Sequence, residues 1–318
     1  MTKYALFNYN TENVGDEIQS LAAKRFLPRV DYYINRDFIN DFHPESDEEI
    51  KLIMNGWYSH RPENFPIKLP QIKPLLVSMY FADYVKDAFS TAENIAYFKQ
   101  HGPVGGRSQD STDFLHSLGV DSYHSACLTL TLQKDETIPK RNFVLAVDVP
   151  EEVYQKLVTL TDSPIIRLHP VANHLYMSID QRMKLAKYYL YLYQSAKFVI
   201  TTRLHATLPS LALETDVLML EKPGFEDSRF KSLRELAHHM TIQEFLESGY
   251  NVEQPPKNPT TYLTYRKQLE DTCRAFTGYQ SNRGFLDGQD IVEFLHDPDL
   301  LQNITTGLHA ASQLYGLE

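Results

Sequence analysis

Short apolar runs alternate with segments of helical periodicity along most of this chain. That alternation is typical of parallel β/α units, because each buried strand is followed by a helix that crosses back over the sheet. One such series opens with an apolar run at residues 4–8 and ends with a helical segment at 111–118. A second series starts at residues 143–147, so we expect an α/β protein with two successive β/α domains and a ligand cleft between them.

The boundary between the two series is a polar stretch at residues 133–141. A chain of 318 residues has room for about two domains of ordinary size. We predict an N-terminal domain over residues 1–135, a C-terminal domain over 140–250, and a helical tail over 251–318 that packs back on the domains. The strands and helices expected in the second series and the tail cover residues 151–160, 165–168, 179–194, 198–201, 204–214, 217–220, 262–276 and 291–295.

Charge and cysteine content exclude several classes of protein. The net charge is −10, from 31 Lys and Arg against 41 Asp and Glu, so no basic footprint for nucleic acid is visible. Cys127 and Cys273 are too few for a disulfide scaffold or a four-thiolate zinc site, and they favour a reducing, cytoplasmic compartment. No signal-peptide pattern and no run of ~20 apolar residues for a membrane span is present. Contact with the inner face of a membrane and assembly into a homo-oligomer stay open.

The first candidate motif is the turn after residues 4–8, which reads Asn13-Val14-Gly15-Asp16. Glycine permits a tight turn there, and the start of the following helix offers free N–H groups to a ligand. Asp16 has two interpretations. It either stabilises the helix N-terminus as a capping acid or acts on a substrate hydroxyl.

The second candidate motif follows a short predicted strand at residues 104–106. Its glycines let the backbone come close to another group, and Arg107 then stands at the end of the strand. A planar guanidinium in this place suits a carboxylate or a phosphate. The alternative is a structural pair between Arg107 and a local acid such as Asp110.

The third candidate motif joins the strand at residues 198–201 to the next helix. A strand-to-helix turn presents unpaired N–H groups and positive dipole charge to an anion. Arg203 adds a fixed charge, and His205 adds a group that exchanges protons near neutral pH. Pro209 is expected to kink or shorten the helix. The alternative interpretation is a core-facing histidine beside a surface arginine.

Histidine placement gives little further signal. His169 follows the strand at 165–168 and either lines the same cleft or is an ordinary loop residue. His238 and His239 are adjacent on a predicted helix, where they point in different directions and form a poor metal pair. No metal-ligand spacing, Walker lysine loop, Rossmann glycine pattern or G-x-S-x-G motif is found, so we expect neither a metal nor a cofactor.

Taken in order, these motifs resemble the polysaccharide pyruvyl transferase family. The turn at residues 13–19 is similar to its N-x-G-D segment, residues 105–115 to its G-x-R-D-x-x-T-x-x-L segment, and residues 196–206 to its signature strand ending in R-L-H-A. Residues 54–57 and 125–129 are similar to one branch of the family. The resemblance covers about residues 3–235.

That resemblance implies two Rossmann-like domains in a glycosyltransferase-B-like arrangement, with the acceptor on the N-terminal side and the donor on the C-terminal side. It also implies transfer of pyruvate from phosphoenolpyruvate to a sugar of a cell-surface polysaccharide or its lipid-linked precursor, as a cyclic ketal. The implied roles are catalysis by His205 and Asp16, acceptor binding by Asn13 and Gly15, and donor binding by Arg107, His169, Thr202, Arg203 and Leu204.

Two other functions remain alternatives on the sequence. A B-type glycosyltransferase that uses a nucleotide sugar would share the two domains and would need an arginine for the diphosphate. A non-catalytic member of the same fold would bind a ligand without turning it over, which the presence of both Arg203 and His205 disfavours. The acceptor sugar and the stereochemistry of the ketal have no signature in the sequence.

Overall fold

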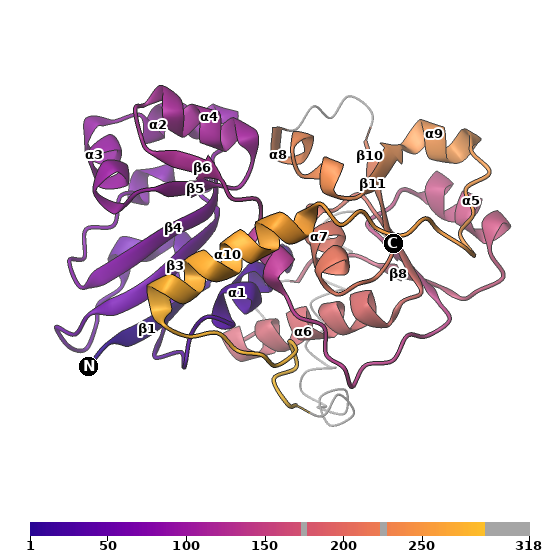
Figure 1. The fold of residues 1–318 in the computed structure, drawn as a ribbon, viewed down its shortest axis with the longest axis horizontal. Coiled ribbons are helices and arrows are strands. Elements are labelled where there is room, and N and C mark those ends of the chain that lie inside the picture. Colours follow the sequence, from indigo (N-terminus) through magenta and orange to yellow (C-terminus); the bar gives the residue numbers. More distant parts are fainter. Residues whose placement is uncertain (173–176, 223–227, 290–318) are drawn as a thin grey trace.

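The computed structural model describes residues 1–172, 177–222 and 228–289, and it contains two all-parallel sheets covered by helices (Figure 1). The first sheet has the strand order β2-β1-β3-β4-β5-β6 and the second has the order β11-β10-β9-β7-β8. The first sheet consists of β1 (Lys3–Asn8), β2 (Tyr32–Asn35), β3 (Ile50–Trp57), β4 (Ile72–Tyr80), β5 (Val104–Gly106) and β6 (Ser122–His124). The second consists of β7 (Val144–Val147), β8 (Ile165–Leu168), β9 (Phe198–Thr201), β10 (Val217–Glu221) and β11 (His238–Thr241).

Helices connect the parallel strands in both halves of the chain. Those of the first half are α1 (Gly15–Lys24), α2 (Lys86–Phe89), α3 (Ala92–His101) and α4 (Gln109–Ser117), with a 3₁₀ turn η4 (Leu128–Thr131) before the second half. Those of the second half are α5 (Glu151–Leu160), α6 (Ile179–Ser195), α7 (Leu204–Ala212), α8 (Ser228–Lys231), α9 (Ile242–Glu247) and α10 (Tyr262–Thr277). None of the helices in the described ranges combines the length and hydrophobicity needed to cross a membrane.

The prediction of two Rossmann-like domains in a glycosyltransferase-B-like arrangement is confirmed, since each half forms its own parallel sheet and a cavity lies between them. Three strands were not predicted: β2, β6 and β11. The expectation that His238 and His239 lie on a helix is wrong, because both belong to β11. The helix expected at residues 291–295 lies outside the described residues.

The two halves share one hydrophobic core. It joins α1, η4, α6, α7 and α10, with fully buried side chains that include Ile18, Leu128, Leu190, Leu211 and Cys273. Separate clusters lie within each half, around Phe7 in the first and Phe198 in the second. Each domain therefore has its own core and contributes to a third one at their junction.

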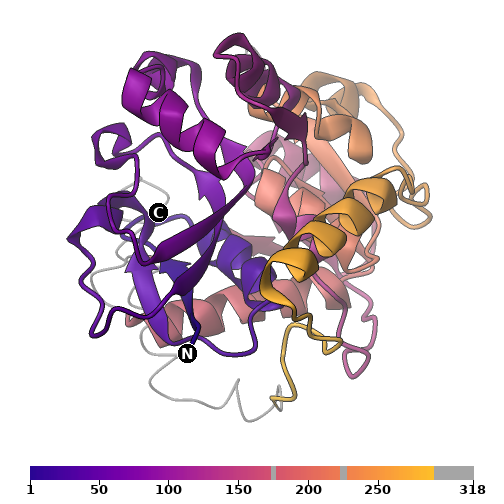
Figure 2. The same ribbon diagram turned by 60° about the vertical axis from the view of Figure 1, so that its left-hand side comes forward.

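Polar contacts reinforce this junction. Arg182 of α6 donates from Nε to Glu17 Oε1 at 2.6 Å and from Nη2 to the Thr11 carbonyl at 2.6 Å, and both side chains are buried. Helix α10 lies across the junction in both views (Figure 1 and Figure 2), and Lys51 Nζ donates to the Phe276 carbonyl at 2.7 Å. The shared core and these polar contacts together join the two sheets.

Candidate active site

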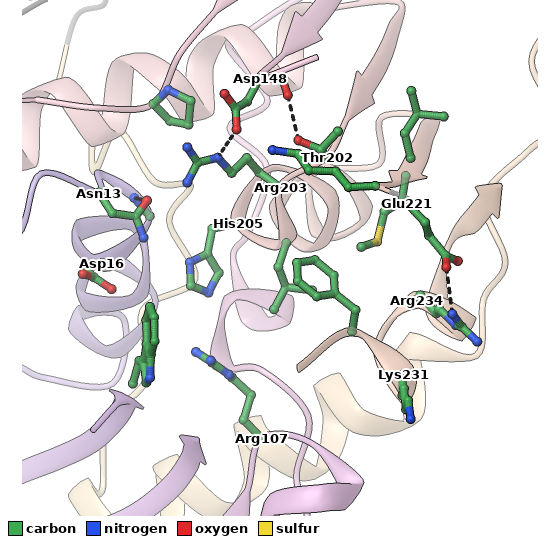
Figure 3. Close-up of a pocket in the computed structure, with 18 of the residues that line it drawn as sticks. Asn13, Asp16, Arg107, Asp148, Thr202, Arg203, His205, Glu221, Lys231 and Arg234 are labelled. Atoms are coloured by element: carbon green, nitrogen blue, oxygen red, sulfur yellow. Dashed lines mark hydrogen bonds and ion pairs between the residues drawn. The ribbon is translucent and has the colours of Figure 1, made fainter. Parts of the chain in front are cut away.

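A cavity of about 610 Å³ opens between the two sheets, where the carboxyl ends of their strands face one another. In such sheets this is the edge at which ligands bind. Figure 3 shows how its side chains converge from both halves. The lining residues are Asn13, Gly15, Asp16, Trp57, Arg107, Asp148, Pro170, Thr202, Arg203, Leu204, His205, Met219, Leu220, Glu221, Lys222, Phe230, Lys231, Arg234 and Thr241.

The turn at Asn13 forms one wall of the cavity. The Asn13 side-chain oxygen accepts from the Gly15 N–H at 3.2 Å, so Asn13 satisfies the start of α1. The Val14 N–H donates to the Pro170 carbonyl at 3.1 Å, which joins this turn to the second half of the chain. A Cβ on Gly15 would lie 2.6 Å from His205 Nδ1, so only glycine lets the histidine pack against the helix start.

Asp16 is 3% exposed and faces the same cavity. Its carboxylate accepts from Thr11 Oγ1 at 2.7 Å and Gln19 Nε2 at 3.1 Å, and Oδ1 lies 3.4 Å from Arg36 Nη1. The N-cap of α1 is Val14, without a side-chain capping bond, and Asp16 lies in the first turn, where the helix dipole favours an acid. Its carboxylate also lines the cavity, so both interpretations of Asp16 fit its position.

Arg107 follows β5 and is only 2% exposed, yet it lines the cavity. Its Nη1 donates to Gln19 Oε1 at 3.2 Å, and its guanidinium stacks 4.8 Å from the centre of the Tyr80 ring. Gln19 thus bridges Arg107 and Asp16. The alternative pairing with Asp110 is wrong, because Asp110 accepts from Lys86 Nζ at 2.9 Å instead.

Arg203 stands at the start of α7 on the opposite wall (Figure 3). Its Nε donates to Asp148 Oδ2 at 2.5 Å, while Thr202 Oγ1 donates to the Asp148 carbonyl at 2.7 Å. Burial would raise the pKa of Asp148, but the hydrogen bond from His169 and the charge of Arg203 bring it below its usual value. Asp148, directly after β7, has a positive φ of 52°, in the left-handed region that non-glycine residues seldom adopt.

His169 does not line the cavity, contrary to expectation. Its Nδ1 lies 3.3 Å from Asp148 Oδ1, so it stands behind the Asp148–Arg203 pair. The reason is the turn at Pro170, whose carbonyl binds the Asn13 turn and which lines the cavity in place of His169. In this structure His169 is connected to the cavity through its contact with Asp148.

His205 lies between the two walls in Figure 3, with Asn13 and Asp16 on one side of it and Arg107 below. Its backbone angles, φ −83° and ψ 19°, depart from those of a helix. Pro209 explains this departure, because a proline ring crowds the carbonyl four residues before it. The imidazole Nε2 lies 3.8 Å from Cys127 Sγ. His205 is nevertheless partly exposed and lines the cavity, so it is not simply a core-facing histidine.

Several cavity residues were missed by the sequence analysis. Glu221, at the end of β10, accepts from Arg234 Nη1 at 2.8 Å and lies 2.8 Å from His239 Nδ1. Lys231 and Arg234 form the side of the cavity away from Asn13 (Figure 3). The one available signal was position, since Trp57, Asp148 and Glu221 all stand at or directly after strand ends.

Five cationic side chains line the cavity, namely Arg107, Arg203, Lys222, Lys231 and Arg234. Arg107 and Arg203 come from different sheets and flank His205, an arrangement suited to an anion with two charged groups and to proton transfer beside it. The described part of the chain holds no group of three or more His, Cys, Asp or Glu side chains that could bind a metal ion.

Comparisons with known proteins complete the description. A family model described as polysaccharide pyruvyl transferase matches residues 13–221. No curated protein matches the chain. A functionally uncharacterized protein of Klebsiella pneumoniae is similar over 76% of this chain and 92% of its own, with 13% identity and a TM-score of 0.46. An S. aureus MnaA–UDP structure is similar over 88% and 98%, with 9% identity and a TM-score of 0.43. These structural similarities are too distant to bear on the chemistry.

Proposed function

Since this chain belongs to the polysaccharide pyruvyl transferase family, we propose that it moves the enolpyruvyl group of phosphoenolpyruvate onto a sugar as a cyclic ketal. The family makes it a transferase of polysaccharide biosynthesis with a saccharide acceptor. The acceptor we propose is a sugar of a cell-surface polymer or of its lipid-linked precursor. One observation carries the proposal: Arg107 and Arg203 reach a single cavity from different sheets, with His205 between them.

The donor side of the reaction follows from charge. Phosphoenolpyruvate carries a phosphate and a carboxylate, and an acidic protein must gather local positive charge to hold both. Arg107 and Arg203 supply two guanidinium groups, and Thr202 and Leu204 stand at the start of α7, where the helix dipole is positive. Asp148 orients Arg203 by accepting from its Nε, which leaves the two terminal nitrogens for the ligand.

The chemical step needs one proton donor and one proton acceptor. A sugar hydroxyl adds to the carbon that bears the phosphate, and the neighbouring methylene carbon takes a proton and becomes a methyl group. The C–O bond to phosphate then breaks, a second hydroxyl of the sugar closes the ketal, and the proton of that hydroxyl passes to the departing phosphate. We assign protonation of the methylene carbon to His205 and removal of a hydroxyl proton to Asp16.

A thermal melt tests the donor assignment. A ligand that binds only the folded state adds roughly 2.7 kcal/mol at a hundred times its dissociation constant. For a chain of this size that is a rise of several degrees in Tm, at about 2–4 °C per kcal/mol. We expect phosphoenolpyruvate to give such a rise and inorganic phosphate a smaller one, since phosphate lacks the carboxylate.

The same melt separates the alternatives. Strong stabilisation by a nucleotide sugar, with none by phosphoenolpyruvate, would replace pyruvyl transfer by glycosyl transfer. Arg167 provides a matched control for Arg203, because both side chains are 37% exposed and both pair with an acid, but Arg167 binds Glu151 outside the cavity. Arg167→Ala should keep the stabilisation by phosphoenolpyruvate. Turnover by the wild-type protein is then tested by measuring the release of inorganic phosphate from phosphoenolpyruvate in the presence of a panel of saccharides.

A further inference from the structure

Trp57 is directed into the cavity by an irregularity in β3. The register between β3 and β4 shifts between Met54 and Gly56, which marks a β-bulge. Gly56 has φ +148°, a conformation that L side chains rarely adopt, and the Asn55 side chain is buried and donates to the Gln19 carbonyl at 3.1 Å. Bulges beside active sites commonly re-aim a side chain. Here the residue after the bulge is Trp57, which lines the cavity.

The indole of Trp57 packs against two neighbouring rings, one of which also contacts Arg107. Its ring centre lies 5.1 Å from that of His60 and 6.4 Å from that of Tyr80, both in edge-to-face geometry. Tyr80 in turn carries the Arg107 guanidinium on its ring, 4.8 Å from the centre. Trp57 is nevertheless partly exposed. An aromatic surface that is fixed, partly open and close to Arg107 is therefore part of the cavity wall.

We propose that Trp57 is the platform on which the pyranose ring of the acceptor sugar stacks. The inference rests on the proposed function and adds the place and orientation of the acceptor. One face of a pyranose presents C–H groups, which pack against an aromatic face, while its rim of hydroxyls needs polar partners. Asn13 and Asp16 supply such partners from the same half of the chain, away from Lys231 and Arg234 (Figure 3).

Phosphoenolpyruvate is a poor occupant for this part of the wall. It has no apolar face to stack, and both of its charged groups need cations, which the indole does not provide. A sugar stacked on Trp57 would instead lie within reach of Asp16 and next to the donor held at Arg107 and Arg203. Bound in this way, its hydroxyls face the reacting carbon.

Trp57 is the single tryptophan of the chain, so fluorescence excited at the red edge of the absorption band, where tyrosine does not absorb, reports on this position alone. The probes are methyl β-galactopyranoside, methyl β-glucopyranoside and methyl α-mannopyranoside, titrated with and without phosphoenolpyruvate. Sorbitol, an open-chain polyol without a ring face, is the control ligand. We expect a saturable change in emission with at least one pyranoside and none with sorbitol. If no pyranoside changes the emission under either condition, the proposal is wrong.

Variants provide a readout that does not depend on the fluorophore. Binding of the pyranoside is followed by saturation-transfer NMR on its ring protons. Trp57→Ala should weaken binding about tenfold, because the aromatic contact is lost, and Trp57→Phe should weaken it less. Tyr84→Ala is the matched control, since Tyr84 is an aromatic residue 74% exposed and outside the cavity. Unchanged binding in Trp57→Ala would overturn the proposal.

Failure of this inference can be told apart from failure of the proposed function. Trp57→Ala should keep the stabilisation by phosphoenolpyruvate, which also shows that the variant folds. A pyranoside that perturbs Trp57 in a protein indifferent to phosphoenolpyruvate supports the sugar site and refutes pyruvyl transfer. Stabilisation by phosphoenolpyruvate without any pyranoside effect supports pyruvyl transfer and refutes the role of Trp57.

Discussion

Replacement of Gly15 by alanine should abolish most activity while the fold survives. The new Cβ would lie 2.6 Å from Nδ1 and 2.9 Å from Cβ of His205, where ordinary contacts begin near 3.4 Å. Because the opposing atoms include the Cβ of His205, rotation of the imidazole alone does not relieve the overlap, and the histidine must move by about 1 Å. A misplacement of about 1 Å in a catalytic group costs roughly 10²-fold in rate.

Stability should respond far less than the rate. Overpacking of this size costs roughly 1–3 kcal/mol, and alanine recovers part of it because glycine is disfavoured in a helix by roughly 0.5–1 kcal/mol. The assay compares kcat for phosphate release with Tm. Gly249→Ala is the control, because Gly249 is exposed and a Cβ there meets nothing within 4 Å. A Gly15→Ala enzyme with the kcat of the wild type would refute the steric argument.

Three further outcomes are expected. Arg203→Ala should lose the thermal stabilisation by phosphoenolpyruvate while Arg167→Ala keeps it, because a charge-assisted bond contributes roughly 1.5–3 kcal/mol; equal loss in both would remove the donor role of Arg203. His205→Ala should lower kcat roughly 10²–10⁴-fold and leave that stabilisation in place, and near-normal turnover would exclude the acid role. Burial raises the pKa of Glu17 from 4.5 to about 7 although Arg182 pairs with it. Glu17 thus holds its proton more tightly in the folded than in the unfolded state. The stability that this protonation contributes is fully present below about pH 4.5 and is lost as the pH rises through about 7. As the pH rises across that window, the Tm of the wild type should fall relative to the Tm of Glu17→Gln. A Tm difference that does not change with pH would contradict the raised pKa of Glu17.

The central strands of both sheets could be predicted from the sequence, but three edge strands could not. β5 and β9 were predicted with their observed bounds and are fully buried between helices. The edge strand β8 was also predicted with its observed bounds, because three of its four residues are apolar although they are only partly buried or exposed. β2, β6 and β11 each stand at the edge of a sheet and pair on one side only. A strand in that position is partly exposed and accepts polar residues, so Ser122–His124 and His238–Thr241 carry no strand signal.

The candidate site shows the same division. Asn13, Arg107, Arg203 and His205 stand in turns directly after strands, and position alone was enough to group them. The carboxylate that orients Arg203 was not predicted. The role of Asp148 depends on its contact with Arg203, which is 55 residues away in the sequence. His169 was expected at the cavity wall from its position after a strand, but its neighbour Pro170 lines the wall and His169 contacts Asp148.

The core shared by the two halves determines how such enzymes can be recombined. Two sheets joined by a polar linker invite chimeras in which one domain is exchanged between relatives at residues 133–141. A cut there would separate Leu128 and Leu130 from their partners on α6 and α7, and it would place the Glu17–Arg182 pair on chains of different origin. A chimera that transplants the second sheet alone would mismatch the apolar surfaces that form the shared core. The exchanged segments should therefore leave this core intact, so that α1, η4, α6, α7 and α10 always come from one parent.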